Sequence, residues 1–281
     1  MRKPLWWATV LAAGAAACRP APKLTESQEY FMGRGVAAQA IEKDGLYADP
    51  ALEEYVTLVG LSVALESDRP ETFKGYTFAV LNSEGVNAFA GPSGFIFVTK
   101  GALKEMRNED ELAGVLAHEI AHVCLKHPEI AAQAAAEKSG LMKYAEEFQG
   151  LAGYGALVAE AFGRSDLARW LELAKEAAPV FGETAQKFYG GLQDGYNRDE
   201  EMAADLLAVE FMSRDGVRYD PNAYKSFIGR LPPKPKGAYA THPGLQGRVD
   251  EIDKAIRKRG KVPSVDPART ARFQEKVKSL R

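Results

Sequence analysis

The segment His118-Glu119-Ile120-Ala121-His122 has the residue types and the spacing of a catalytic metal site. Residues four positions apart lie on the same face of an α-helix, so His118 and His122 can present two imidazoles to one metal ion. Glu119 can then reach a water molecule on that ion, remove its proton and later deliver the proton to a leaving amine. We therefore predict a catalytic Zn²⁺ site, because this set of groups is typical of zinc peptidases.

The residues around this segment predict a buried helix. Asn108 can cap the helix, and Glu109, Asp110 and Glu111 follow in its first turn, with Glu111 placed as in a capping box. The alternative is that the two histidines and the glutamate lie on a solvated surface. That alternative leaves the apolar neighbours unexplained, namely Val115, Leu116, Ala117, Ile120, Ala121 and Val123. Since those neighbours favour burial, the polar trio needs a metal ion or a hydrogen-bond network.

A peptidase site of this kind needs a third protein ligand. The metzincin pattern places a glycine and a histidine downstream, but this chain has Leu125 and Pro128 there, which excludes that class. A second candidate helix begins at Asn197, a good capping residue, and carries Glu201 and Asp205 one turn apart on one face. Glu201 could bind the metal while Asp205 orients another ligand. Alternatively, the acidic first turn only complements the helix dipole.

Four blocks of the sequence together resemble one family. They are Asn87-Ala88-Phe89-Ala90 with residues 94–101, the segment 118–123 with His127, the block Arg198, Glu201, Ala204 and Asp205, and Thr241-His242-Pro243 with Arg248. Over about residues 26–252 the chain resembles the zinc endopeptidases that include HtpX and the CAAX prenyl proteases, in particular their short periplasmic lipoprotein members. Ser93 stands where that family usually has a glycine.

The resemblance implies roles for several residues. It identifies Glu201, rather than Glu200, as the third zinc ligand, and it places Asp205, Arg198 and Arg248 around the ligands. It also implies an edge strand formed by Asn87, Ala88, Phe89 and Ala90. A polypeptide substrate would add to that strand in an extended form, main chain to main chain.

The remaining histidines and Cys124 carry weaker signals. His242 lies in a loop, where it could donate to the transition state, act as a reversible fourth ligand or be an ordinary surface residue. His127 lies about 140° around the helix from His122, so we expect capping or packing rather than metal binding. We expect Cys124 to face away from the ligands as a small buried hydrophobe.

Hydrophobic periodicity predicts the elements that position these groups. Residues 26–64 show helical spacing with a break at 43–45, which predicts a helical N-terminal lobe. Residues 76–81 and 95–99 predict strands, with an edge strand at 86–90, and helices dominate from residue 108. The expected fold class is α+β and mostly helical, a zincin-like metallopeptidase with a small antiparallel-edged sheet beside the active-site helix. We expect one domain over residues 26–253.

The N-terminal residues predict a secretion signal and a lipid anchor. Residues 1–17 have a basic start and an apolar run too short to span a bilayer, and Ala15-Ala16-Ala17-Cys18 resembles a lipobox. Lipid on Cys18 would make residues 18–25 a membrane tether. Arg19 after the cysteine favours the outer membrane of a Gram-negative bacterium, with the protein facing the periplasm. The alternative is an ordinary cleavage site with Cys18 as an incidental thiol.

Two further segments need an explanation of their own. Residues 128–196 carry apolar residues at helical spacing, and we expect a helical insertion that is either a lid over the cleft or a structural lobe. Residues 254–281 form a basic tail. We expect a solvated amphipathic helix there, with a surface for anionic lipid or a partner as the alternative.

Composition limits the function further. The chain has 281 residues, 46% of them hydrophobic, and a formal net charge of -2, which fits a folded core and gives no nucleic-acid footprint. We expect a zinc endopeptidase that hydrolyses unfolded or misassembled cell-envelope proteins. One alternative is a latched, weakly proteolytic chaperone or assembly factor for outer-membrane proteins, with His242 as the latch. Another is a zinc hydrolase of the aminopeptidase type, for which no residue clearly offers recognition of a free amine.

Overall fold

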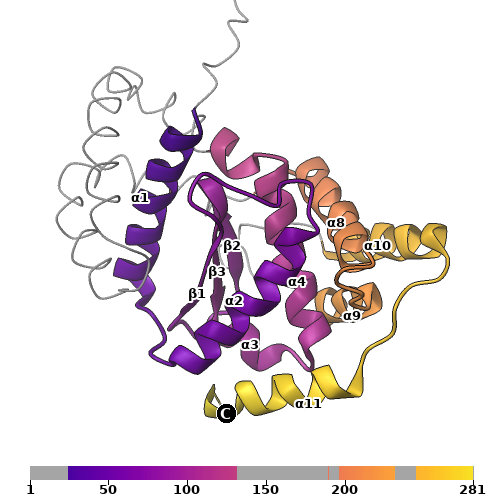
Figure 1. Cartoon of the computed structure of the whole chain (residues 1–281). Helices are drawn as coiled ribbons and strands as arrows, with labels where there is room; N and C mark the ends of the chain where they lie inside the picture. The colour runs from indigo at the N-terminus through magenta and orange to yellow at the C-terminus, as the bar shows by residue number, and fades with distance from the viewer. Residues whose placement is uncertain (1–24, 132–188, 190–195, 232–244, 281) are drawn as a thin grey trace, which may run out of the picture.

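A three-stranded sheet lies between helices in the part of the chain that the computed structural model describes, residues 25–131, 189, 196–231 and 245–280. Helix α1 (Glu26–Asp44) covers one face of the sheet, and α2 (Pro50–Leu65) and α4 (Glu109–Cys124) cover the other (Figure 1). This arrangement confirms the predicted α+β, mostly helical fold class. The two N-terminal helices form as expected, but they pack on opposite faces of the sheet and do not make a separate lobe.

The sheet consists of β1 (Thr77–Leu81), β2 (Ala88–Gly91) and β3 (Phe95–Thr99), in the order β1-β3-β2. Strand β3 is parallel to β1 and antiparallel to β2, so β2 is an outer strand with antiparallel pairing, as predicted. Successive side chains of each strand face α1 and the α2–α4 side in turn. Because both faces are covered, the strands are apolar at nearly every position instead of alternating with polar residues.

A short 3₁₀ turn, Pro92–Gly94, joins β2 to β3. Ser93 has a φ of 61° in this turn, a left-handed conformation that favours glycine. The backbone N–H of Ser93 donates to Oε1 of Glu129 at 3.3 Å, and this bond helps to hold the unfavourable backbone. A serine can therefore occupy a position where the resembled family usually has a glycine.

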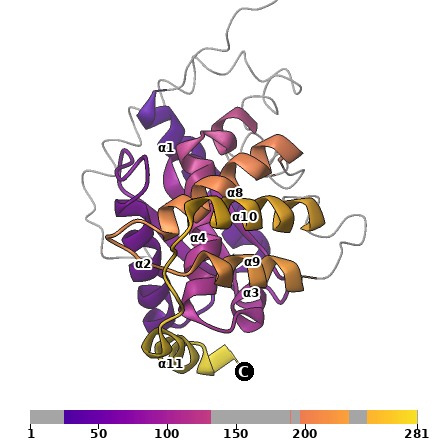
Figure 2. The ribbon, with the colours of Figure 1, turned by 90° about the vertical axis from the view of Figure 1, so that its right-hand side faces the viewer.

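Helices from the second half of the chain pack around α4. Helix α3 (Lys100–Glu105) follows the sheet and leads into α4. Helices α8 (Arg198–Met212) and α9 (Pro221–Arg230) contact α4 directly, and α10 (Leu245–Arg259) lies against α8 and α9 (Figure 2). Helix α10 includes residue 253, the residue at which we place the end of the expected domain. Among the described residues, no helix is both long and apolar enough to cross a bilayer.

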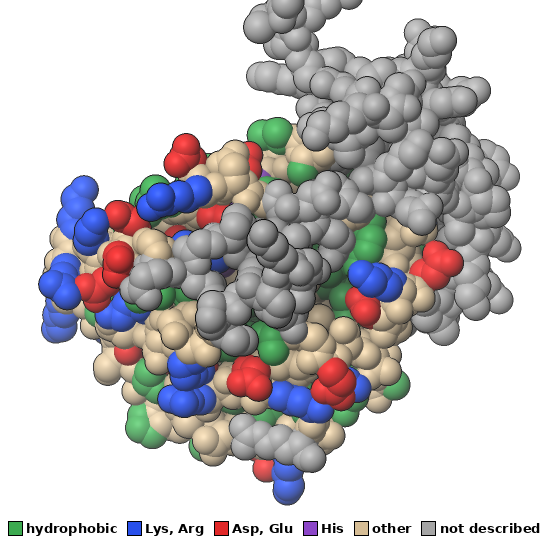
Figure 3. Space-filling view, turned by 180° about the vertical axis from the view of Figure 1, so that it is seen from behind, with side chains coloured by type: hydrophobic (Ala, Val, Ile, Leu, Met, Phe, Trp, Pro, Cys, Tyr) green, Lys and Arg blue, Asp and Glu red, His purple; other side chains and the backbone are tan. Residues whose placement is uncertain are grey.

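The C-terminal tail contains a helix, α11 (Pro267–Lys276), that packs against α2 and the start of α4. Phe273 and Val277 are fully buried in the main core, and Leu280 is buried beside them. The tail is thus an amphipathic helix, as predicted, but its apolar face belongs to the core. On the face of the molecule in Figure 3, basic and acidic side chains of the described residues are interspersed, in line with the small net charge.

Candidate metal centre

The first turn of α4 is capped as the sequence predicts. Oδ1 of Asn108 accepts a hydrogen bond from the backbone N–H of Glu111 at 2.9 Å. The Glu111 carboxylate, however, accepts from the N–H of Arg107 at 2.9 Å, and not from that of Asn108. Arg230 of α9 also binds this carboxylate, at 2.6 Å. The predicted capping box is therefore half formed, because a tertiary ion pair fixes the glutamate elsewhere.

All three acidic residues of this turn are buried, and each one binds an arginine from a C-terminal helix. The pairs are Glu109 with Arg272 at 2.5 Å, Asp110 with Arg269 at 2.9 Å and Glu111 with Arg230 at 2.6 Å. A buried carboxylate without a partner is costly. These pairs therefore tie α9 and α11 to the start of the helix that carries the two histidines.

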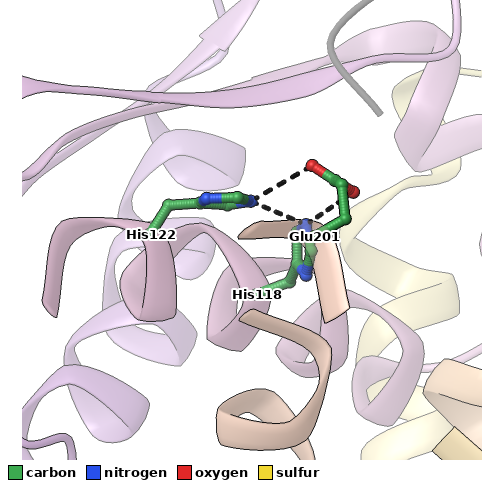
Figure 4. A group of neighbouring side chains, drawn as sticks. All are labelled: His118, His122 and Glu201. Atoms are coloured by element: carbon green, nitrogen blue, oxygen red, sulfur yellow. Dashed lines mark hydrogen bonds and ion pairs between the residues drawn. The ribbon is translucent and has the colours of Figure 1, made fainter. Parts of the chain in front are cut away.

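His118 and His122 of α4 and Glu201 of α8 point toward one another (Figure 4). The two Nε2 atoms lie 3.0 Å apart, and the Glu201 oxygens lie 3.6 Å from Nε2 of His118 and 3.5 Å from Nε2 of His122. All three side chains are buried. Two imidazole nitrogens and one carboxylate oxygen within 4.8 Å of one another fit a divalent metal ion, and this donor set is typical of catalytic zinc sites.

The cap of α8 explains why Glu201, and not Glu200, faces the histidines. Oδ1 of Asn197 accepts from the backbone N–H groups of Asp199 and Glu200, each at 3.0 Å. The Glu200 carboxylate returns to the N–H of Asn197 at 2.8 Å, which completes a capping box. The side chain of Glu200 is thus engaged at the cap, whereas Glu201 lies fully buried against α4.

Asp205 and Arg248 both contact residues of the donor cluster. Oδ1 of Asp205 lies 3.0 Å from Nδ1 of His118, one turn of α8 after Glu201. Arg248 of α10 reaches Glu201 at 2.8 Å and binds both oxygens of Asp205 at 2.7 Å. Burial by itself raises the pKa of Asp205, but the Arg248 guanidinium and the contact with His118 outweigh burial and hold that pKa well below its ordinary value.

Arg198, which the resemblance placed around the ligands, makes no hydrogen bond or ion pair with the donor cluster among the described residues. Arg198 is exposed on the first turn of α8, and its Nη2 lies 3.2 Å from the position that a Cβ on Gly247 would occupy. Among the described side chains that contact Glu201 and the histidines, Arg248 takes the place that we assigned to both arginines.

His127 contacts His122 of the donor cluster, although we expected it to lie far around the same helix. Helix α4 ends at Cys124, Lys126 has a left-handed φ of 57°, and residues 127–131 are helical again. This turn brings Nδ1 of His127 to 2.8 Å from Nδ1 of His122. The three clustered donors are His118, His122 and Glu201, and His127 lies beside them in contact with His122.

Tyr196 covers the other side of His122. The two rings are stacked, with centroids 4.1 Å apart and an angle of 19° between their planes. Burial, followed by the negative charge of Glu119, raises the pKa of Tyr196 well above its ordinary value. Glu119 itself is 1% exposed, so the predicted general base lies inside the protein beside the donor cluster.

The predicted substrate strand lies at the edge of the sheet. Ala88, Phe89 and Ala90 belong to β2, and the carbonyl of Asn87 accepts from the N–H of Thr99 at 3.0 Å just before the strand begins. Strand β2 packs beside α4, so the outer edge of the sheet and the donor cluster share one region of the fold.

Cys124 is the last residue of α4. It is a free thiol, and it is half-buried against the core rather than fully buried.

Several features that the sequence predicts lie outside the described residues. They are His242, Cys18, the expected signal and most of the expected insertion.

Two tyrosines at this centre carried no signal in the sequence. Tyr196 precedes the cap of α8, and Tyr224 of α9 donates a hydrogen bond to Asp205 at 2.6 Å. Neither belongs to a recognisable motif, and both reach the centre only through tertiary packing.

The chain is similar in sequence to known peptidases. Residues 50–256 match the model of Peptidase family M48. A Vibrio cholerae protein named putative beta-barrel assembly-enhancing protease is 27% identical over 244 residues, which are 83% of this chain and 45% of that protein. The beta-barrel assembly-enhancing protease of Escherichia coli K12 is 27% identical over 232 residues, which are 80% of this chain and 43% of that protein.

A mitochondrial relative has similar identity over a shorter region. Metalloendopeptidase OMA1 of Bos taurus is 27% identical over 187 residues, which are 63% of this chain and 32% of that protein. The chain thus spans less than half of the length of each of these three relatives.

Proposed function

The chain belongs to peptidase family M48, and from this and from its buried donor cluster we propose that it is a zinc-dependent endopeptidase. The observation that carries the proposal is the approach of Nε2 of His118, Nε2 of His122 and the Glu201 carboxylate from two helices far apart in sequence. These three groups would hold one Zn²⁺ per chain.

The charges around the cluster support a divalent cation. Glu119, Glu201 and Asp205 are buried carboxylates, and Arg248 is the buried cation that touches two of them. Three carboxylates beside two imidazoles form a strongly electronegative site inside the protein. Such a site favours a divalent cation, because buried negative charge is costly.

Each side chain has a defined task in the proposed reaction. When bound, the metal ion supplies Lewis acidity, which makes water a better nucleophile at neutral pH and polarises the scissile carbonyl. Glu119 takes the proton of the attacking water and returns it to the leaving amine. Oδ1 of Asp205 lies 3.0 Å from Nδ1 of His118 and would accept a hydrogen bond from a proton held there, so that Nε2 keeps its lone pair for the metal. His127 does the same for His122.

We propose that substrates are extended segments of unfolded or misassembled envelope proteins. The position of β2 beside α4 is compatible with this substrate class, because main-chain pairing with a strand makes little demand on the side chains of the substrate. The relatives in Vibrio cholerae and Escherichia coli are named as assembly-enhancing proteases, which favours a peptidase over the chaperone alternative.

We also propose a location in the cell envelope. Lipid on Cys18 would hold the chain at the outer membrane of a Gram-negative bacterium, facing the periplasm, and the relatives named above support an envelope role. Replacement of Cys18 by alanine should release the mature chain from membranes without abolishing its activity.

Hydrolysis of unfolded casein tests the proposed activity. The purified chain should cleave casein, lose the activity after treatment with a chelator and regain it when Zn²⁺ is added back. Casein that stays intact with the zinc-loaded chain would contradict an endopeptidase. Cleavage that persists after complete removal of metal would contradict the role of the metal.

A further inference from the structure

Tyr224 of α9 is a fully buried residue whose phenol lies between Asp205 and Arg248. Its hydroxyl donates to Oδ1 of Asp205 at 2.6 Å and accepts from Nη2 of Arg248 at 3.1 Å. The same Nη2 donates to Oδ1 of Asp205 at 2.7 Å. The phenol, the carboxylate and the guanidinium therefore form a closed triangle in which each group binds the other two.

The Asp205 carboxylate of this triangle contacts His118, one of the proposed metal ligands. Oδ1 of Asp205, the oxygen that Tyr224 binds, also lies 3.0 Å from Nδ1 of His118. A histidine that binds metal through Nε2 carries its proton on Nδ1, and the acceptor of that proton sets the orientation of the ring. The position of Asp205 therefore decides how His118 faces the centre.

The Arg248 guanidinium of this triangle lies next to Glu201 and Nε2 of His118. Nη1 of Arg248 is 2.8 Å from Oε2 of Glu201, and Nη2 is 3.5 Å from Nε2 of His118. A guanidinium that moved further toward these atoms would compete with a metal ion for the Glu201 carboxylate. The bonds from Nη2 to Tyr224 and Asp205 restrict further movement of the guanidinium toward these atoms.

We propose that Tyr224 is a positioning residue of the metal centre. Its hydroxyl fixes Asp205 and Arg248, so that His118 presents Nε2 to the metal and Glu201 keeps an oxygen available. This inference rests on the proposed metal site, and it adds a residue from a helix that contributes no ligand.

The packing of α9 on α4 supports this role independently. Gly114 lies one turn before His118 on α4, and a Cβ at this position would lie 2.4 Å from Cβ of Tyr224. Glycine is unfavourable inside a helix. At position 114, however, it allows the close approach of the two helices that places the phenol at Asp205.

The matched test compares Tyr224→Phe with Tyr55→Phe. Tyr55 donates to Oε2 of Glu109 on α4 at 2.9 Å, and Tyr224 donates to Oδ1 of Asp205 on α8 at 2.6 Å, so each variant removes one buried phenol–carboxylate bond. Only the bond of Tyr224 adjoins the metal ligands. The two variants should therefore lose similar thermal stability as metal-free proteins, whereas their metal centres should differ.

Two measurements report on the metal centre directly. After loading with Zn²⁺, Tyr224→Phe should release the metal to a chelator about tenfold faster than wild type, the size expected for an outer partner of a ligand. After loading with Co²⁺, its visible absorption bands should shift. Tyr55→Phe should match wild type in both measurements.

The outcomes separate this inference from the proposed function. A wild-type chain that binds neither Zn²⁺ nor Co²⁺ would overturn the proposed metal site and the inference with it. If wild type binds metal and Tyr224→Phe equals Tyr55→Phe in release rate and spectrum, the inference alone is wrong. Gly114→Ala provides a second variant, because it keeps the hydroxyl but displaces the ring. It should shift the Co²⁺ bands, and unchanged bands in a folded Gly114→Ala protein would also overturn the inference.

Discussion

Arg248 binds Asp205 through two nitrogen atoms, Nε and Nη2, which each lie 2.7 Å from a different oxygen of the carboxylate. This two-point contact is specific to a guanidinium and fixes the plane of the carboxylate. Because Asp205 also faces His118, helix α10 helps to orient a histidine of the donor cluster that α4 supplies. The centre is therefore complete only when helices from both halves of the family-matched region are packed together.

The two neighbouring glutamates of α8 should differ in their effect on metal binding. Glu201→Gln removes the carboxylate that faces the histidines, so we expect at least a tenfold loss of zinc affinity. Glu200→Gln keeps an oxygen that can accept from the N–H of Asn197, so zinc affinity should stay near that of wild type. Zinc content after dialysis against a weak chelator measures both, and equal losses would show that the assignment of the ligand is wrong.

The pairing of α11 with α4 should contribute to stability and not to metal binding. Arg272→Gln leaves the buried carboxylate of Glu109 without its cation, although Tyr55 and Tyr219 still donate to it. Since the arginine is half exposed, we expect a loss of about 1 to 2 kcal/mol in the free energy of unfolding, with zinc affinity unchanged.

Urea unfolding of Arg272→Gln should be compared with that of Lys278→Gln. Lys278 is an exposed residue just after α11, so this control loses the same charge without touching α4. Equal stability of the two variants would contradict a role for the buried pair.

Part of this centre follows from local sequence, and part does not. The histidine pair and the two asparagine caps are recognisable because helical spacing and capping chemistry act within a few residues. The prediction that His127 lies about 140° around the helix from His122 was wrong. Helix α4 ends at Cys124, and Lys126 has a left-handed backbone that its residue type does not favour. Tyr196 and Tyr224 were missed because their roles depend on the packing of separate helices.

In the sheet, too, the strands follow from the local sequence but their pairing order does not. Strands β1 and β3 and the outer position of β2 follow from β-branched and aromatic residues between glycines. The pairing order β1-β3-β2 does not, because it depends on which helix covers each face. The basic tail was expected to be solvated, since nothing in its sequence reveals that Arg269 and Arg272 bind acids on α4.

Glu129 should make the stability depend on pH. Burial, followed by the charge of Glu29, raises the pKa of Glu129 from 4.5 to about 7. The folded chain therefore binds this proton more tightly than the unfolded chain does. The contribution of Glu129 to stability is greatest at low pH and is lost as the pH rises from about 4.5 to about 7.

Glu129→Gln should remove this dependence while keeping an acceptor for the N–H of Ser93. Relative to wild type, the variant should gain about 1 to 3 kcal/mol in the free energy of unfolding between pH 5 and pH 8. Urea unfolding at several pH values measures this, with the exposed Glu71→Gln as the control. Parallel curves for wild type and Glu129→Gln would contradict the raised pKa.

The most direct measurement is the zinc content and the casein hydrolysis of Glu119→Gln beside those of wild type. Glu119 is proposed as the base and not as a ligand, so the variant should hold one zinc ion per chain, as wild type does. Its hydrolysis should fall by about 10² to 10⁴-fold, because proton transfer is lost while the ligands remain. A variant that loses its zinc, or one that cleaves casein at the wild-type rate, would contradict a metal centre in which His118, His122 and Glu201 bind and Glu119 transfers the proton.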